Sequence, residues 1–175
     1  TETTPLPAGR AYGAAFPVGN LFYVVGGSDA SGPTDTIFYT SISSKDGSLG
    51  FSGTPKFWEN NQIRLPRALS HFSHALHDGR IFVIGGKTTS GVTDTIFHAR
   101  VWQKGNIGNW YESPRRLPEP RFNTSAAILY DTSGQVAVVR LAVVGGIDED
   151  GRVANDGVLC TVGTSGYLDA QVEAF

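Results

Sequence analysis

The sequence predicts an all-β fold in which a small sheet is repeated along the chain. Three apolar runs end on a pair of glycines, namely LFYVVGG at residues 21–27, IFVIGG at 81–86 and LAVVGG at 141–146. The first glycines of these pairs are 59 and 60 residues apart, a regular period that indicates a repeat architecture. The 175 residues include 22 glycines and only 17% charged residues, and β-branched and aromatic residues gather in short runs. This composition favours strands joined by tight turns.

Each copy is expected to contain four strands, the first two forming a hairpin. A Leu-Pro pair precedes the first strand, which we place at residues 10–16, 71–77 and 123–130. The second strand is the apolar run. Gly19-Asn20 and Asp78-Gly79 separate the two strands in the first two copies and are typical of two-residue hairpin turns. In the third copy, residues 130–136 predict a longer hairpin loop.

The third and fourth strands follow a polar loop. The third strand is predicted at residues 34–42 and 93–101, which share the letters TDTIF, and the third copy has the degenerate NDGVL at 155–159, displaced by two residues. The fourth strand is expected to end on an aromatic residue, Trp58 or Trp110, with Phe175 at the corresponding place in the third copy. Each tryptophan lies seven residues before the next Leu-Pro, so the copies agree in register.

Composition narrows the classes of partner. A net charge of −2 without a Lys/Arg cluster argues against nucleic acid. The longest apolar stretch, residues 136–144, is far below the roughly 20 residues of a spanning helix, so no membrane-spanning segment is expected. The one cysteine, Cys160, is expected to behave as a small buried hydrophobe. The sequence does not begin with Met, and we expect a secreted, periplasmic or cell-surface protein, with a cytoplasmic location left open.

The recurring pattern resembles the kelch repeat of β-propellers. It consists of an apolar run, Gly-Gly, a polar loop, a strand, a glycine turn and a tryptophan, with Leu-Pro-x-x-Arg ahead of the next run. The long period and the DGSLG turn at residues 46–50 are similar to bacterial kelch-like repeats. The resemblance implies three four-stranded antiparallel blades, at about 6–60, 65–112 and 117–175. Since about four to eight blades close a ring, three imply an open or partial propeller. The repeat markers are Gly26, Gly27, Gly85, Gly86, Gly145, Gly146, Trp58 and Trp110.

Candidate ligand-binding residues lie at equivalent positions of the three copies. Tyr12, His71 and Asn123 share one register position and are expected on the innermost strands, where they would gather near a central channel. Arg10 and Arg121 belong to the Leu-Pro-x-x-Arg element, which has Leu69 in the second copy. His71 and His74 are expected to point to opposite faces of a strand, so they cannot bind one metal ion together, and no metal site is predicted. No cofactor is predicted either. The acidic turn at residues 148–151 lacks the full spacing of a calcium loop.

The sequence contains no nucleophile beside a base in a recognisable catalytic motif. We therefore expect a scaffold or binding module whose loops contact a protein partner or a glycan, or which associates with further blades of the same chain or of other chains. The alternative is a carbohydrate-active enzyme of the sugar mutarotase or oxidase type, with a channel site completed by additional blades. The copper oxidase type is disfavoured because Cys160 stands on a predicted third strand, without the expected Tyr crosslink.

Overall fold

Three four-stranded antiparallel sheets form the protein. The computed structural model describes residues 5–50, 58–102, 107–134, 136–163 and 165–174. Within these residues every regular element is a strand, and no helix is long and apolar enough to cross a membrane. The sheets are β1 (Ala14–Val18), β2 (Leu21–Val25), β5 (Ile37–Ser41) and β6 (Glu59–Asn60); β7 (Ser73–His77), β8 (Arg80–Ile84), β11 (Thr95–Arg100) and β12 (Tyr111–Arg116); β13 (Ser125–Asp131), β14 (Val138–Val144), β15 (Gly157–Val162) and β16 (Leu168–Ala174). The all-β prediction is confirmed, and we call these sheets, each with the segment before it, blades 1 to 3.

In each blade the strands lie side by side in the order of the sequence. The hairpin between β7 and β8 turns through Asp78 and Gly79, both at positive φ, as a two-residue turn of this kind requires. The longer hairpin predicted in the third copy is also present, because Asp131 pairs with Val138. Two small hairpins, β3 (Ser28–Asp29) with β4 (Gly32–Pro33) and β9 (Lys87–Thr88) with β10 (Gly91–Val92), follow the glycine pairs of blades 1 and 2.

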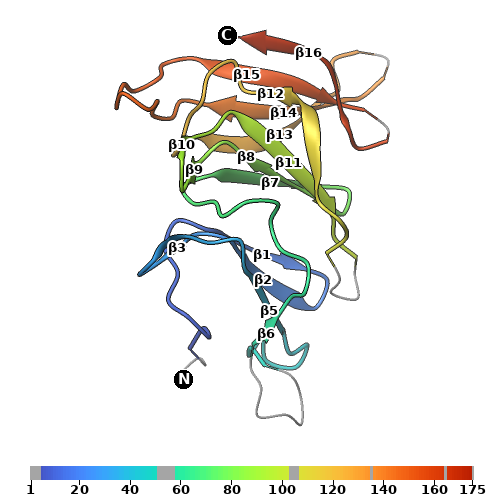
Figure 1. The fold of residues 1–175 in the computed structure, drawn as a ribbon. Coiled ribbons are helices and arrows are strands. Elements are labelled where there is room, and N and C mark those ends of the chain that lie inside the picture. The colour runs from blue at the N-terminus through green and yellow to red at the C-terminus, as the bar shows by residue number, and fades with distance from the viewer. Residues whose placement is uncertain (1–4, 51–57, 103–106, 135, 164, 175) are drawn as a thin grey trace.

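The blades are stacked face to face, and the hydrophobic core lies between them (Figure 1). The alternation of side chains along β8 shows this directly. Ile81 and Val83 pack into the layer between blades 1 and 2, whereas Phe82 and Ile84 pack into the layer between blades 2 and 3. All four side chains are fully buried. The IFVIGG run is apolar throughout because its strand is covered on both faces.

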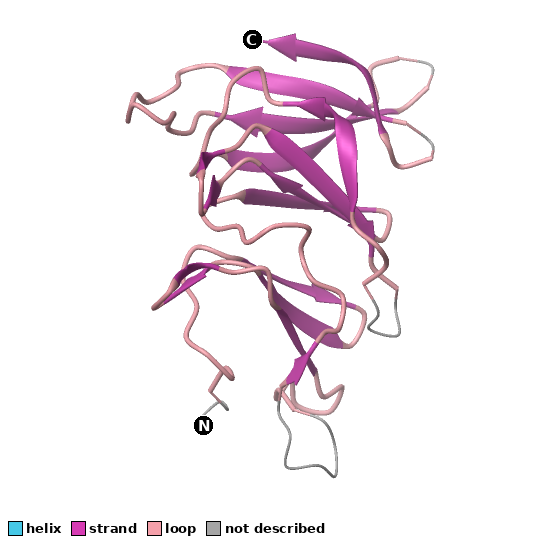
Figure 2. Ribbon diagram, in the orientation of Figure 1, coloured by secondary structure: helices cyan, strands magenta, loops and turns pink. Residues whose placement is uncertain are grey.

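The fourth strands differ from the expectation. The fourth strand of blade 2 was predicted to end on Trp110, but β12 begins directly after it, at Tyr111. In blade 1 the described part, β6, likewise follows Trp58, and residues 51–57 lie outside the described residues. Phe175, the expected aromatic of the third copy, also lies outside them. Figure 2 shows that the loops connect the strands at the two sides of the stack of sheets, where the strands end.

Candidate functional site

Tyr12, His71 and Asn123 share an unusual backbone conformation. Their φ angles are 58°, 56° and 54°, in the left-handed region that costs an L-residue about 1–2 kcal/mol. Each lies two residues before the first strand of its blade, rather than on that strand as expected. Because the same strained conformation recurs three times at one register position, it is a feature of the repeat.

The three residues in the left-handed conformation form a row of backbone hydrogen bonds that crosses the blades. The N–H of His71 donates to the carbonyl oxygen of Tyr12 over 2.8 Å, and the N–H of Asn123 donates to that of His71 over 2.8 Å. A buried bond of 2.7 Å between the Ser73 and Thr124 hydroxyl groups supports the row where blades 2 and 3 meet. The structure therefore brings the three predicted residues together, and we call them the Tyr12–His71–Asn123 row.

The side chains of the row and its neighbours form an aromatic surface. The rings of Tyr12 and His71 are stacked, with centroids 3.9 Å apart and an interplanar angle of 18°. Phe122 meets His71 edge-on, and the Lys87 ammonium lies 3.7 Å from the Phe122 centroid. Burial and the nearby Lys87 lower the pKa of His71, so its ring is neutral at pH 7. Tyr12 remains 63% exposed, so one face of the stack is open to a ligand.

A cleft of about 350 Å³ adjoins this surface where the loops of blades 2 and 3 meet. Lys87 and Phe122 line one side, and Asp148 and Glu149 line the other. The acidic turn that contains them is held by Arg152, whose N–H donates to Asp148 over 2.8 Å and whose guanidinium pairs with Asp150 at 2.6 Å. Within the described residues no group of three His, Cys, Asp or Glu side chains is placed to hold a metal ion.

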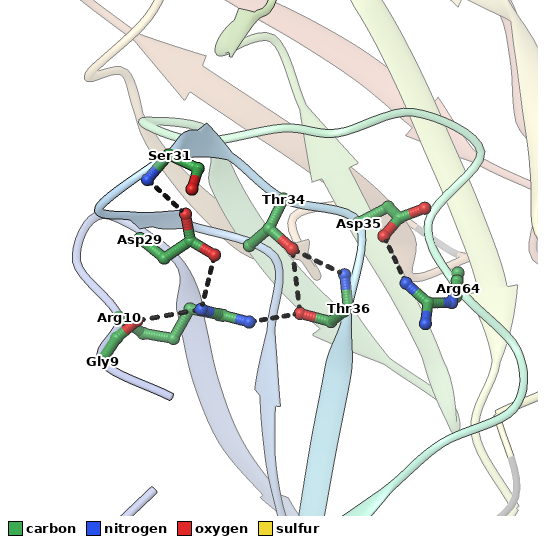
Figure 3. Close-up of polar contacts among 8 residues, drawn as sticks. All are labelled: Gly9, Arg10, Asp29, Ser31, Thr34, Asp35, Thr36 and Arg64. Atoms are coloured by element: carbon green, nitrogen blue, oxygen red, sulfur yellow. Dashed lines mark hydrogen bonds and ion pairs between the residues drawn. The ribbon is translucent and has the colours of Figure 1, made fainter. Parts of the chain in front are cut away.

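The guanidinium groups of Arg10 and Arg121 both bind side chains of this chain. Arg10 donates to Thr36 over 2.5 Å and lies 3.4 Å from Asp29, with its side chain only 5% exposed (Figure 3). Arg121 makes two parallel bonds to Asp156, of 2.6 and 2.9 Å, and its side chain is 8% exposed. This pairing raises the pKa of Arg121 and lowers that of Asp156. Both arginines therefore fasten the segment before β1 or β13 to its own blade.

Asp156 was missed by the sequence analysis because the third copy was aligned one residue out of register. The N–H groups of Gly26, Gly85 and Gly145 donate to the carbonyl oxygens of Thr36, Thr95 and Asp156. These bonds make Asp156 the counterpart of the second threonine of TDTIF, so the third copy has one extra loop residue where two were expected. The sequence does carry a signal for the Arg121–Asp156 contact. Asp156 places a carboxylate where blade 1 has the Thr36 hydroxyl that Arg10 contacts.

A second cleft, of about 400 Å³, lies between blades 2 and 3 and is lined by His77, Asp78, Arg80, Arg100 and Asp169. His98 is buried beside it, and its Nδ1 accepts a 3.0 Å hydrogen bond from Arg80. Burial, together with the Arg80 charge, lowers the pKa of His98 to about 4. Arg80 also donates to the Ser165 carbonyl and covers the Tyr167 ring, so its guanidinium is committed to holding the two blades together.

The remaining predictions concern buried side chains. His74 lies on β7 against Phe16, between blades 1 and 2, whereas His71 precedes that strand and does not share its alternation of faces. Cys160 is buried with a free thiol, and burial raises its pKa. Trp110 packs against the layer between blades 1 and 2, and Trp58 meets the Phe22 ring edge-on.

Comparisons with known proteins agree with this architecture. No protein-family model matches the chain. The human Kelch-like protein 33 is 29% identical over 125 residues, which is 71% of this chain and 21% of that protein. The solved structure of YjhT superposes with a TM-score of 0.64 at 18% identity, covering the whole of this chain and 48% of that one. The chain thus spans about a fifth of the one and half of the other. These similarities and the stacked four-stranded sheets support a β-propeller fold of the kelch type.

Proposed function

We propose that the chain is a binding module that contacts a protein partner through the exposed edge of the Tyr12–His71–Asn123 row. The observation that carries the proposal is the Tyr12 ring, which is largely exposed yet stacked on His71 at 3.9 Å. Tyrosine gives a large amphipathic contact area at a small cost in conformational entropy and is enriched in protein interfaces. A pre-stacked ring loses little further freedom on binding.

The surroundings of the row favour a protein surface over a small ligand. The neighbouring loops differ in charge from blade to blade, with Asp29 in blade 1, Lys87 in blade 2 and Asp148 and Glu149 in blade 3. Charges of both signs spread over three blades fit a surface with a complementary pattern, which steers association and excludes wrong partners. The strand scaffold holds the loops in place, as is common for binding surfaces.

The proposal is tested by selecting binders from a random peptide display library on the immobilised chain and then measuring their affinity for a Tyr12→Ala variant. We expect the affinity to fall at least about tenfold, because an anchoring tyrosine commonly contributes more than about 1.4 kcal/mol. Tyr130→Ala is the matched control, since Tyr130 is 64% exposed but lies on β13, outside the row.

Two results contradict the proposal. One is a set of selected peptides that bind Tyr12→Ala as tightly as the parent chain. The other is the absence of peptide binders together with binding of oligosaccharides on a glycan array, which would assign the stacked rings to a sugar.

A further inference from the structure

The cleft of about 400 Å³ between blades 2 and 3 is separate from the Tyr12–His71–Asn123 row. It lies where β8 begins, at Arg80, whereas Ser70, next to His71 of the row, pairs with Lys87 after the other end of β8. Its walls come from two neighbouring blades, and its volume lies in the range of about 300–1,000 Å³ that is usual for small-molecule sites. The cleft is therefore of a size for a small molecule.

Four charged side chains line this cleft without pairing with one another. Asp78, Arg80 and Arg100 belong to blade 2, and Asp169 belongs to blade 3. Within the described residues none of these four side chains forms an ion pair. Close ion pairs, with distances of 2.6–2.8 Å, are formed elsewhere in the chain by Arg64 with Asp35, Arg116 with Asp94 and Arg121 with Asp156. The cleft thus combines charges of both signs that no other side chain in the described part of the chain pairs with.

Arg100 is the cation of the cleft that is available to a ligand. It lies directly opposite Arg80 in the pairing of β11 with β8, and like charges at directly opposed positions repel each other. The Arg80 guanidinium is held by His98 and by the Ser165 carbonyl. Arg100 is exposed, and its guanidinium lies 4.9 Å from the Trp102 ring centroid, without a hydrogen-bond acceptor among the described residues. A carboxylate bound to Arg100 would supply an acceptor and reduce the repulsion from Arg80.

Asp169 brings a carboxylate to the blade 3 wall of the cleft. Both of its carboxylate oxygens lie 2.9 Å from the position that a Cβ would take at Gly163. Gly163 does not have a positive φ, so what its missing side chain provides is room for this carboxylate. Asp78, in the turn between β7 and β8, adds a second carboxylate from blade 2. An ammonium group is the natural partner of such carboxylates.

The cleft also has an apolar part. Val139 of β14 and Val162 of β15 line it, and both side chains belong to the hydrophobic layer between blades 2 and 3. An apolar group that covers them is removed from water, which favours binding. A ligand that matches the whole lining therefore carries a negative group, a positive group and an apolar side chain.

We propose that this cleft binds a small zwitterion, an α-amino acid with an apolar side chain. Its carboxylate accepts hydrogen bonds from Arg100 on blade 2, its ammonium group donates to Asp169 on blade 3, and its side chain covers Val139 and Val162. Charge-assisted hydrogen bonds of this kind are among the strong ones in proteins. The bound molecule contacts both blades, and the site is independent of the protein partner proposed for the row.

Isothermal titration calorimetry of the chain with L-leucine tests the proposal, together with two analogues that each lack one charge. N-acetyl-leucine has no ammonium group, and leucinamide has no carboxylate. We expect each analogue to bind at least about tenfold more weakly than leucine, because the loss of a hydrogen bond between charged groups commonly costs this much. Inorganic phosphate is the further comparison, and tighter binding of phosphate than of leucine would show a site for anions only and overturn the proposal.

Two variants remove the charges of the cleft one at a time. Arg100 and Asp169 are exposed and form no ion pair within the described residues, so Arg100→Gln and Asp169→Asn are expected to fold, which circular dichroism checks. Each is expected to weaken leucine binding at least about tenfold. Arg64→Gln is the matched control, with the affinity of the parent chain, because Arg64 pairs with Asp35 and does not line the cleft.

Three further results overturn the proposal. The first is the absence of leucine binding at millimolar concentration. The second is binding that Arg100→Gln and Asp169→Asn leave unchanged, and the third is an analogue that binds as tightly as leucine.

Discussion

At the scale of single residues, His98 shows how packing between blades controls the charge of a side chain. The imidazole is buried and accepts a hydrogen bond from Arg80 through Nδ1, so protonation would place a second cation beside the guanidinium at a buried position. The folded state therefore holds His98 neutral, with its pKa lowered to about 4. Neutral His98 lets Arg80 reach the Ser165 carbonyl across the contact between blades 2 and 3.

The lowered pKa predicts a loss of stability in mild acid. The folded pKa of His98 lies below the unfolded value of about 6.5, so the unfolded chain binds the proton more tightly. The contribution is fully present above about pH 6.5 and disappears as the pH falls towards 4, with an upper bound of about 3 kcal/mol. Urea unfolding at pH 7 and pH 5 measures it. His98→Asn, which keeps a hydrogen-bond acceptor, is expected to reduce the difference, and an unchanged difference would count against this explanation.

Residue roles were only partly predictable. Tyr12, His71 and Asn123 could be grouped from the sequence because counting from Leu-Pro aligns them. Their left-handed backbone could not be predicted, since none of them is glycine. For His71 and Asn123 the conformation accompanies a hydrogen bond from the N–H to a carbonyl group of the preceding blade. Arg121 was assigned to a ligand because its partner, Asp156, lies 35 residues away behind a loop of different length.

At the scale of elements, the strands before the glycine pairs were predictable and the fourth strands were not. An apolar run ended by two glycines predicts a strand covered on both faces, as β8 is. The fourth strand lies at the outer edge of its sheet, so burial does not impose one pattern on it. The prediction therefore relied on the tryptophan, and β12 begins after Trp110 and includes Pro114, as an edge strand permits.

The position of Trp110 predicts its energetic role. Trp110 is half-buried and packs on the layer between blades 1 and 2, so Trp110→Ala is expected to lower the free energy of unfolding by about 2–3 kcal/mol, less than the roughly 3–5 kcal/mol typical of a fully buried aromatic. Trp102→Ala is the control, because Trp102 is 50% exposed and contacts the Arg100 guanidinium. Urea titration of both variants checks the difference, and equal losses would show that Trp110 does not fasten the blades.

At the scale of the whole molecule, the chain is a stack in which blades 1 and 2 are each covered by the following blade. The two core layers lie between blades, and the glycine pairs and the Tyr12–His71–Asn123 row join the blades through backbone hydrogen bonds. The repeat period predicted this architecture. It could not predict the inter-blade bonds, because these join residues that belong to no strand.

The most direct test of this account is amide hydrogen exchange, followed by NMR, at the residues that bridge the blades. We expect the amides of Gly27, Gly86, His71 and Asn123 to exchange as slowly as those inside β8, since each donates to a neighbouring blade. Exchange of these four amides at the rate of exposed loop positions, while β8 remains protected, would show that the blades are not joined in this way and would contradict the propeller arrangement.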